Sequence, residues 1–303
     1  MLAAEGYAHR LRRRRIRSGP RALFILPAAL FMVVFAGYPL FEMARMSFSK
    51  VGFENLLGHW PYVGTKNFTD LFATPDFNSA LKNTLIFVTV VVAVSMVGGM
   101  AAALLIQRST RGTRFVQALL LFSWMLPPVV SGSVWKFLFA SDGALNGILH
   151  TVGVKPVLWL VEPGFVLYAV AFVNAWAALP FAAIVLKAGL LGIPQDTQEA
   201  GAVDGAGSWR VFWQITLPQL LPIIFVLTVI ITVYAFRSFD FLFVMTQGGP
   251  GTASTTLPYL AYRDAFVIGF FGQGAAAAMV SGLCVAAAAL FYVRLTRRAE
   301  AHA

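Results

Sequence analysis

The 303-residue sequence is 58% hydrophobic and only 12% charged, and its mean hydropathy is +0.74. Soluble domains carry roughly 25% charged residues, so this composition excludes an ordinary soluble protein and predicts an integral membrane protein. The formal net charge is +10. Because the basic residues form short clusters beside apolar runs rather than a basic domain, the charge indicates membrane topology and lipid contacts, not nucleic-acid binding.

The residue types that carry catalysis or bind metals form no cluster. The single cysteine, Cys284, lies in an apolar run, and the four histidines are scattered along the chain. A phosphate-binding loop of the form G-x-x-x-x-G-K-[ST] is absent from the sequence, and no cluster of His, Asp and Glu suggests a membrane enzyme. We therefore expect no catalytic, metal or cofactor site, and any ATP that drives this chain would be bound by another subunit.

The chain begins with a basic segment, residues 1–21, that contains seven arginines. An apolar run follows from about residue 22 to residue 43. A secretory signal peptide has the same basic start and apolar core, but this run is about 22 residues long, enough to cross a hydrocarbon core of about 30 Å. No small-x-small cleavage site ends it, so we predict a retained first transmembrane helix. Residues 47–82 then form a mixed polar stretch.

Five further apolar runs predict the remaining membrane helices, at about 84–106, 115–139, 165–186, 220–245 and 275–293. Pro127 and Pro128 interrupt the third run. Prolines free backbone carbonyls that, inside a membrane, need a neighbouring helix or a water-filled cavity, so we expect this helix to be kinked or broken. The predicted fold is an all-α integral membrane protein with six transmembrane helices in one domain, residues 22–298, followed by a short tail, residues 299–303.

The polar segment between the fourth and fifth runs, residues 191–218, is broken by glycines. A short helix is predicted over 195–203, and Gly205 and Gly207 end it. Ser208 suits the N-cap of a second short helix that extends to Gln214, and Pro218 suits the first turn of the next membrane helix.

One side of this 191–218 loop carries only small residues, so that a partner protein could approach the backbone closely. Three charged side chains could orient that partner. The small residues are Ala200, Gly201, Ala202, Gly205 and Ala206, and the charged ones are Glu199, Asp204 and Arg210.

The pattern E-A-x-x-x-x-G, nine residues, then I-x-L-P resembles the EAA loop of membrane subunits of binding-protein-dependent ABC importers. It is carried by Glu199, Ala200, Gly205, Ile215, Leu217 and Pro218. The triplet Asp204–Ala206 is similar to the sugar-importer branch, whereas Gly201 stands where the family usually has alanine. The resemblance implies that this loop couples to an ATPase through Glu199, Ala200, Gly201, Asp204, Gly205, Ala206 and Arg210.

Outside the loop, several motifs are similar to the same sugar permeases. They are carried by Val63, Gly64, Asn67 and Phe68; by Ala80, Leu81, Asn83 and Thr84; by Gly143, Leu145 and Asn146; and by Thr246, Gly248, Gly249, Pro250, Thr255, Thr256 and Tyr262. Resemblance to the permease of maltose importers further implies that Asn174, Phe181 and Ser238 contact the solute.

Arg237 and Asp240 are ionisable residues in the predicted fifth span, where charges are costly and usually functional. Their spacing of three residues predicts one shared helix face. They are either a mutually neutralised pair near the outer end or part of the solute path. Arg237 would suit an anion, and residues 233–236, VYAF, are similar to the permease of glycerol-phosphate importers. The solute therefore stays open between a disaccharide, another sugar and a glycerol phosphate.

Most of the basic residues lie inside if the N-terminus is inside, so the positive-inside rule places both termini and the 191–218 loop in the cytoplasm. The resemblance implies a plasma-membrane protein that works by alternating access with a second homologous permease, two copies of an ATPase subunit that bind ATP and Mg, and an extracytoplasmic solute-binding protein. The alternative is a secondary transporter driven by an ion gradient. That class needs an inverted repeat and carboxylates near the midplane of the membrane. In this sequence only Asp240 comes close to such a carboxylate.

Overall fold

The structure, a computed structural model, describes residues 20–300. Within that range the elements are helices, and the one strand-like pairing is an isolated bridge between Ser49 and Tyr62. Five helices are long and apolar enough to cross a membrane, and a bent pair of shorter helices makes a sixth span if it is counted as one. The predicted all-helical membrane fold is confirmed. Most of the predicted basic segment, residues 1–19, and residues 301–303 of the predicted tail lie outside the described residues.

The chain divides between Arg45 and Met46 into two parts, each of which is described by itself. The first part contains α1 (Pro20–Met32), a π-helical turn (Val33–Gly37) and most of α2 (Tyr38–Ser47). Together they form one apolar helix over Phe24–Ser47. Its bulky apolar side chains are exposed, as expected for a helix that meets lipid or another apolar surface.

The second part is built on the close packing of α4 (Pro75–Ile106) against α8 (Val166–Leu191). A Cβ atom on Gly98 would lie 2.6 Å from Leu179 Cδ1, and one on Gly99 would lie 2.6 Å from Ala182 Cβ. The hydroxyl of Ser95 also donates to the Ala175 carbonyl at 3.2 Å. Small residues and an interhelical hydrogen bond are the usual means by which helices associate in lipid.

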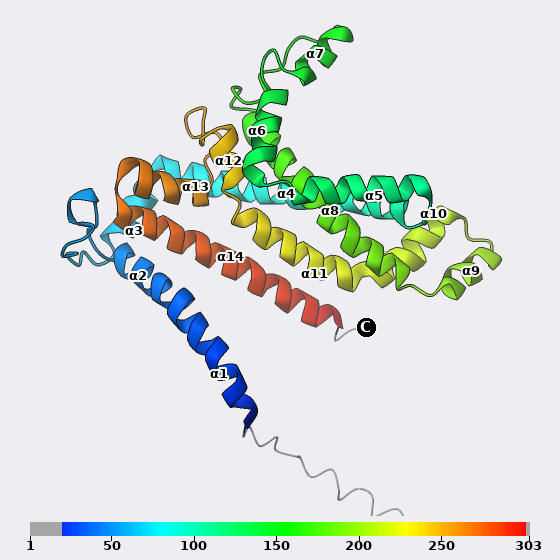
Figure 1. The fold of residues 1–303 in the computed structure, drawn as a ribbon, viewed down its shortest axis with the longest axis horizontal. Coiled ribbons are helices and arrows are strands. Elements are labelled where there is room, and N and C mark those ends of the chain that lie inside the picture. The colour runs from blue at the N-terminus through cyan, green and yellow to red at the C-terminus, as the bar shows by residue number, and fades with distance from the viewer. Residues whose placement is uncertain (1–19, 301–303) are drawn as a thin grey trace, which may run out of the picture. The chain divides into compact units, whose positions relative to one another are not determined.

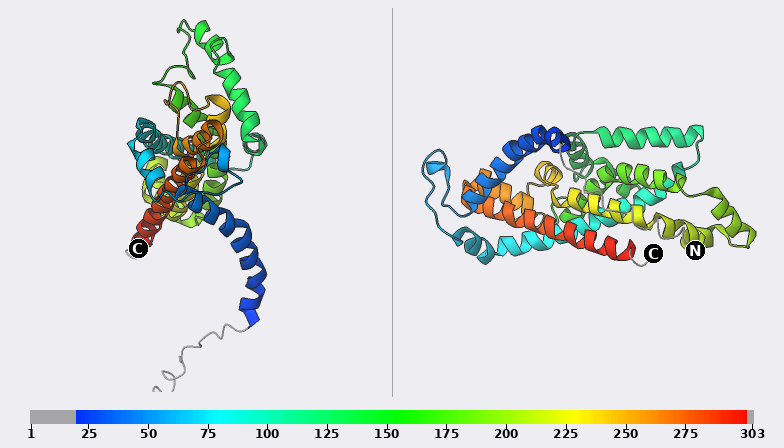
Figure 2. Two further views of the ribbon diagram at one scale, coloured as in Figure 1. Left: turned by 90° about the vertical axis from the view of Figure 1, so that its left-hand side faces the viewer. Right: turned by 90° about the horizontal axis from the view of Figure 1, so that it is seen from below.

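Three further helices lie alongside this pair (Figures 1 and 2). α11 (Leu217–Phe236) contacts α4, α8 and α14 (Phe271–Glu300), and α5 (Arg111–Met125) contacts α4 and α8. The buried core between them is formed by large apolar side chains, among them Phe87, Val91, Leu186, Leu227 and Ile231.

The two ends of this bundle carry different short elements (Figure 1). α9 (Gln195–Val203) and α10 (Ser208–Val211) lie at one end, called here the loop end. α3 (Lys66–Ala73) and α13 (Leu257–Tyr262) lie at the opposite, or far, end. The other short elements are a 3₁₀ turn (Phe53–Asn55), α6 (Pro128–Leu138), α7 (Ala144–Thr151), α12 (Asp240–Met245) and π-helical turns at Phe212–Thr216 and Arg263–Ile268.

Several helix ends differ from the sequence-based prediction, most of all the start of α4 and the end of α11. α4 starts at Pro75 rather than near residue 84, because the Thr74 hydroxyl caps it by accepting from the Phe77 amide at 3.3 Å. α11 ends at Phe236 rather than near residue 245, and α12 follows as a separate helix packed on α6. α5 and α6 meet at 104° across Leu126 and Pro127, so the predicted break is confirmed and is much sharper than a kink.

Candidate functional site

The 191–218 loop folds into a helix, a glycine turn and the start of a second helix. α9 has the predicted bounds and ends in a Schellman-type turn, in which the Ala206 amide donates to the Gly201 carbonyl at 3.0 Å. Gly205 takes a φ of +79° there, a conformation that favours glycine. The predicted second short helix is present as α10, but its N-cap is Gly207 rather than Ser208. It does not end near Gln214: it passes through the π-helical turn Phe212–Thr216 into α11, and Pro218 lies in the first turn of α11 as predicted.

Gly201 lies where α9 packs on the Phe212–Thr216 turn. A Cβ atom at Gly201 would lie 2.5 Å from Ile215 Cδ1. Because that atom is the far end of a flexible side chain, a small rotation of Ile215 would admit the alanine that is usual in related loops. The glycine therefore fits a close contact inside the loop, but the contact does not require it.

The charged residues of the loop are available to a partner. Glu199, Asp204 and Arg210 are exposed, and none of them forms an ion pair within the described chain. Glu199 and Ala206 also line a cavity of about 580 Å³ that reaches Arg108 beyond the end of α4 and Trp209 on α10. Trp209, Phe212 and Trp213 pack on one another beside it, with ring centroids 5.5 to 6.5 Å apart.

Two of the predicted solute residues, Asn174 on α8 and Ser238 after α11, are brought together. Asn174 Nδ2 donates to Ser238 Oγ at 2.5 Å. Asn174 is completely buried, and its carbonyl oxygen Oδ1 has no hydrogen-bond partner in the described chain. A buried polar atom without a partner is costly, so this amide has unused capacity for a hydrogen bond.

Phe181, the third predicted solute residue, lines a cavity of about 350 Å³ between α5, α8 and α11. Its ring stacks on Trp124 with centroids 5.8 Å apart and planes at 29°. Tyr234 and Ser123 also line the cavity. Sequence reasoning missed Trp124 and Tyr234. The sequence feature that could have indicated these residues is the pair Pro127–Pro128, because the sharp turn before Pro128 brings the end of α5 to this cavity.

The prediction that Arg237 and Asp240 share a helix face is wrong. α11 ends at Phe236, and Asp240 is the first residue of α12. Both side chains are exposed, and the ion pairs of the described chain do not include one between them. They are therefore not a mutually neutralised pair in this conformation.

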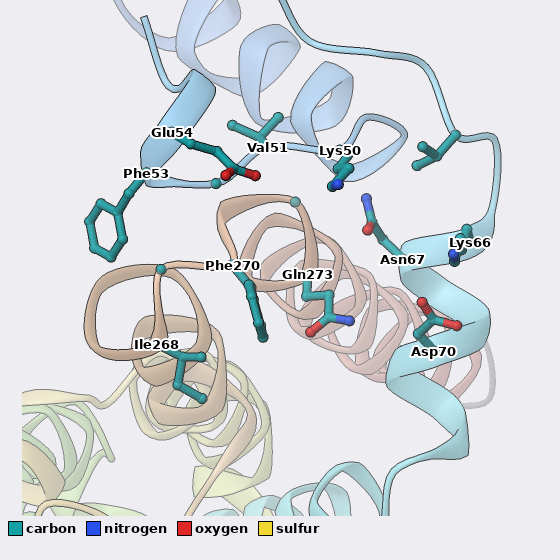
Figure 3. Close-up of a pocket in the computed structure, with 14 residues that line it drawn as sticks. Lys50, Val51, Phe53, Glu54, Lys66, Asn67, Asp70, Ile268, Phe270 and Gln273 are labelled. Atoms are coloured by element: carbon teal, nitrogen blue, oxygen red, sulfur yellow. The ribbon is translucent and has the colours of Figure 1, made fainter.

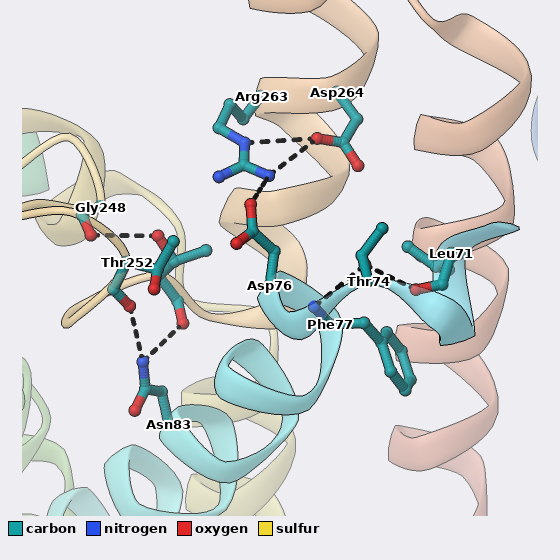
Figure 4. Close-up of polar contacts among 10 residues, drawn as sticks. Leu71, Thr74, Asp76, Phe77, Asn83, Gly248, Thr252, Arg263 and Asp264 are labelled. Carbon is teal, nitrogen blue, oxygen red and sulfur yellow. Dashed lines mark hydrogen bonds and ion pairs between the residues drawn. The ribbon is translucent and has the colours of Figure 1, made fainter.

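Two of the sequence motifs outside the loop, those around Asn83 and around residues 248–256, hold the far end together (Figure 4). Asn83 Nδ2 donates to the carbonyls of Thr252, Ala253 and Thr255 at 3.0 to 3.2 Å. The Thr255 hydroxyl in turn donates to the Gly248 carbonyl at 3.0 Å. A Cβ atom at Gly248 would lie 2.5 Å from the Tyr259 ring, so the glycine is required there. These residues position the loop before α13.

An ionic network joins the start of α4 to the turn that follows α13 (Figure 4). Arg263 Nη2 lies 2.7 Å from Asp76 Oδ2 and 3.2 Å from Asp264 Oδ1. Burial raises the pKa of the Asp264 carboxyl, and the charge and hydrogen bond of Arg263 oppose this only in part. Nearby, a cavity of about 480 Å³ lies between residues 50–70 and the start of α14, with Lys50, Glu54, Asp70 and Gln273 around it (Figure 3).

The described helices, apolar enough to cross a membrane, define a multi-pass integral membrane protein. The family model for the binding-protein-dependent transport system inner membrane component matches residues 95–301. That match covers more than half of the chain, so the protein belongs to this family and is a multi-pass component of the inner membrane.

Similar proteins cover nearly the whole chain. The trehalose/maltose transport system permease protein MalF of Thermococcus litoralis is 31% identical over 91% of this chain and 92% of that protein. The diacetylchitobiose uptake system permease protein DasB of Streptomyces coelicolor is 31% identical, over 94% and 91% respectively. A crystal structure of a bacterial alginate ABC transporter, in complex with an alginate pentasaccharide-bound periplasmic protein, contains a chain with a TM-score of 0.77 and 25% identity, over 92% of this chain and 94% of that one.

The predicted resemblance to permeases of carbohydrate-importing ABC transporters is therefore confirmed. These relatives are transport components, in agreement with a transport subunit rather than an enzyme.

Proposed function

We propose that this chain is the membrane-spanning permease subunit of an ATP-driven importer, and that it translocates a sugar delivered by an extracytoplasmic solute-binding protein. The observation that carries this proposal is the cavity where the rings of Trp124, Phe181 and Tyr234 converge. Aromatic rings offer flat apolar faces that match the C–H-bearing faces of sugar rings. The volume of about 350 Å³ falls in the range of about 300 to 1,000 Å³ of small-molecule sites. The names of both relatives support the same solute class.

A second cavity extends the path toward the loop end. It has a volume of about 670 Å³ and lies along the same seam between α8 and α11, with Val185, Ile223 and Val226 in its lining. Ile230 lines both cavities. A solute released from the aromatic cavity would follow this seam. The buried Asn174 amide would gain a partner from the solute or from water once its contact with Ser238 opens.

Coupling to ATP would act through the 191–218 loop, which under the positive-inside rule faces the cytoplasm together with both termini. Its small residues let the groove of an ATPase subunit approach, and Glu199, Asp204 and Arg210 have free charges. ATP and Mg would be bound by two such subunits. Closure of the ATPase pair must favour one membrane conformation for coupling to occur. Two ATPase subunits offer two grooves, but one chain has only one such loop. A second homologous permease would therefore fill the other groove.

A solute that carries an anionic group, such as a glycerol phosphate, is the second candidate. The observation that favours it is Arg237, an exposed cation without an ion-pair partner in the described chain, directly before Ser238. Transport driven by an ion gradient is not favoured, because the chain belongs to a family of binding-protein-dependent systems.

The sugar proposal is tested with the complete importer, reconstituted in liposomes with its ATPase subunits, partner permease and binding protein. Phe181→Ala removes one face of the aromatic stack, and we expect uptake at limiting sugar to fall about tenfold, corresponding to about 1 kcal/mol of aromatic contact and some lost packing. Phe122→Ala, on α5 and outside the cavity lining, serves as the control and should leave uptake near the wild-type rate. Equal uptake by both variants would exclude this cavity from the solute path.

A further inference from the structure

The cavity of about 480 Å³ at the far end has a wall of aromatic rings and hydrogen-bonding side chains. Nearly all of this wall comes from residues 50–54, 66–70 and 268–273 (Figure 3). The volume falls in the range of about 300 to 1,000 Å³ of small-molecule sites. Two carboxylates, two ammonium groups and two amides line it, and they belong to Glu54, Asp70, Lys50, Lys66, Asn67 and Gln273. The cavity therefore suits a small ligand that forms many hydrogen bonds.

The charged groups of this cavity have no ion-pair partner among residues 20–300. A carboxylate only accepts hydrogen bonds, and an ammonium group only donates them. A hydroxyl group does both, so a ligand with several hydroxyls can use both kinds of group. Asn67 has a different part, because its Nδ2 donates to the carbonyls of Ser47 and Ser49 at 2.9 Å and so holds the wall of the cavity in place.

Phe53 presents an aromatic ring beside these groups. A Cβ atom at Gly269, which has a φ of +90°, would overlap the Phe53 ring, so the glycine lets this ring lie against the backbone. Phe271 contacts the same ring edge to face, with centroids 5.3 Å apart. The Phe53 side chain is nevertheless 66% exposed. A fixed and exposed ring beside unpaired hydrogen-bonding groups matches a sugar, which has apolar C–H faces and polar hydroxyl edges.

Aromatic rings continue from Phe53 toward the predicted solute residues. Consecutive ring centroids lie 4.8 to 5.8 Å apart along the series Phe53, Phe271, Phe266, Tyr262 and Phe239. None of these five side chains is buried. Phe239 directly follows Ser238, whose hydroxyl accepts from the buried Asn174 amide. The five rings therefore connect the cavity at the far end to the predicted solute contacts.

We propose that this cavity is an entry site, where a sugar binds on the extracytoplasmic side before it reaches the aromatic cavity at Phe181. The sugar stacks on Phe53, its hydroxyls donate to Asp70 and form hydrogen bonds with Gln273, and the five rings then guide it toward Ser238. This inference rests on the proposed function for the solute class and for the side of the membrane. It adds a second sugar site at the end of the bundle opposite the 191–218 loop.

The test is photolabelling of the complete importer in lipid nanodiscs, with its ATPase subunits, partner permease and binding protein. The probes are maltose and diacetylchitobiose that carry a diazirine, and peptide mass spectrometry locates the labels. We expect labels on residues 50–54 or 268–273 as well as on the peptide that contains Phe181. An excess of the same sugar without the diazirine should remove the labels at both places.

Two variants test the residues of the entry site. Phe53→Ala should reduce labelling there about fivefold, as for loss of one aromatic contact. Phe72→Ala is its matched control, because Phe72 is an exposed phenylalanine of the same end that does not line the cavity. Asp70→Asn should reduce labelling about tenfold, since it removes a charge-assisted hydrogen bond. This second variant keeps the shape of the side chain and leaves the packing of Phe53 intact.

The outcomes separate this inference from the proposed function. Labels on the Phe181 peptide without labels on residues 50–54 or 268–273 would overturn the entry site alone. Labels at the entry site alone would count against the Phe181 cavity as the solute path, and labels at neither place would overturn both proposals. Unchanged labelling in Phe53→Ala and Asp70→Asn, together with weaker attachment of the binding protein, would show that the cavity receives a protein segment and would also overturn the entry site.

Discussion

Arg237 is the charged side chain directly before Ser238, whose hydroxyl accepts from the buried Asn174 amide. In a helix this arginine would have had Asp240 on its own face, and its charge would have been partly neutralised. Because α11 ends at Phe236, the guanidinium is exposed and has no ion-pair partner in the described chain. A free cation next to the predicted solute contacts is an electrostatic feature that a neutral sugar does not need.

Replacing Arg237 with Gln should therefore separate the two candidate solute classes. We expect uptake of a phosphorylated solute to fall about tenfold, as for loss of one charge-assisted hydrogen bond, whereas uptake of a neutral sugar should change little. Asp240→Asn is the control, because it alters a neighbouring charge of the opposite sign. Competition assays with paired neutral and phosphorylated solutes measure the effect. Equal losses for both solutes would instead indicate a structural role for the arginine.

At the scale of elements, the contact between α4 and α8 depends on two adjacent glycines that differ in what surrounds them. A Cβ atom at Gly98 would meet only the end of the Leu179 side chain, which can rotate. A Cβ atom at Gly99 would meet Ala182 Cβ at 2.6 Å and the Ala183 backbone nitrogen at 3.2 Å. Neither of those atoms can move without separating the helices.

Gly99→Ala should consequently destabilise the bundle by about 1 to 3 kcal/mol, the usual cost of overpacking, whereas Gly98→Ala should cost less. The two variants add the same methyl group one residue apart, so each controls for the helix propensity of the other. Thermal unfolding of the purified protein in detergent, followed by size-exclusion chromatography, measures the difference. A Gly98→Ala variant as unstable as Gly99→Ala would show that the backbone contact is not the limiting one.

The elements themselves were largely predictable, because long apolar runs without charge have few alternatives to membrane helices. Their ends were not. The polar residues after Pro75 hide the start of α4, whereas Arg237 and Asp240, which directly follow the break after Phe236, also fit polar positions inside one longer helix through Met245. Packing of α12 on α6 accompanies that break, and such tertiary contacts cannot be predicted from the sequence of a single apolar run. The same holds for the candidate site: the motif spacing indicated Asn174 and Phe181, but Trp124 reaches the cavity only through the 104° turn.

At the scale of the whole molecule, the 191–218 loop is the surface through which we propose that the ATPase subunits drive transport. Replacing Glu199 with Lys reverses an exposed charge without removing a contact inside the described chain. We expect loss of ATPase co-purification and of uptake, while the chain itself stays folded. Asp196→Lys, an equal charge reversal on the exposed first turn of α9, should have the smaller effect. Unchanged ATPase association in Glu199→Lys would remove this carboxylate from the interface.

The helix from Ser208 to Phe236 joins the loop to the predicted solute residues, and the π-helical turn Phe212–Thr216 lies within it. Its 20-residue part α11 is about 30 Å long, and a tilt of about 5° about one end would displace the other end by about 2.6 Å. Ser238 follows α11 by two residues, and such a displacement would break its hydrogen bond to Asn174. Under the proposed coupling, α11 would therefore act as a lever, through which a small rotation imposed at the loop end opens the contact at the buried amide on α8.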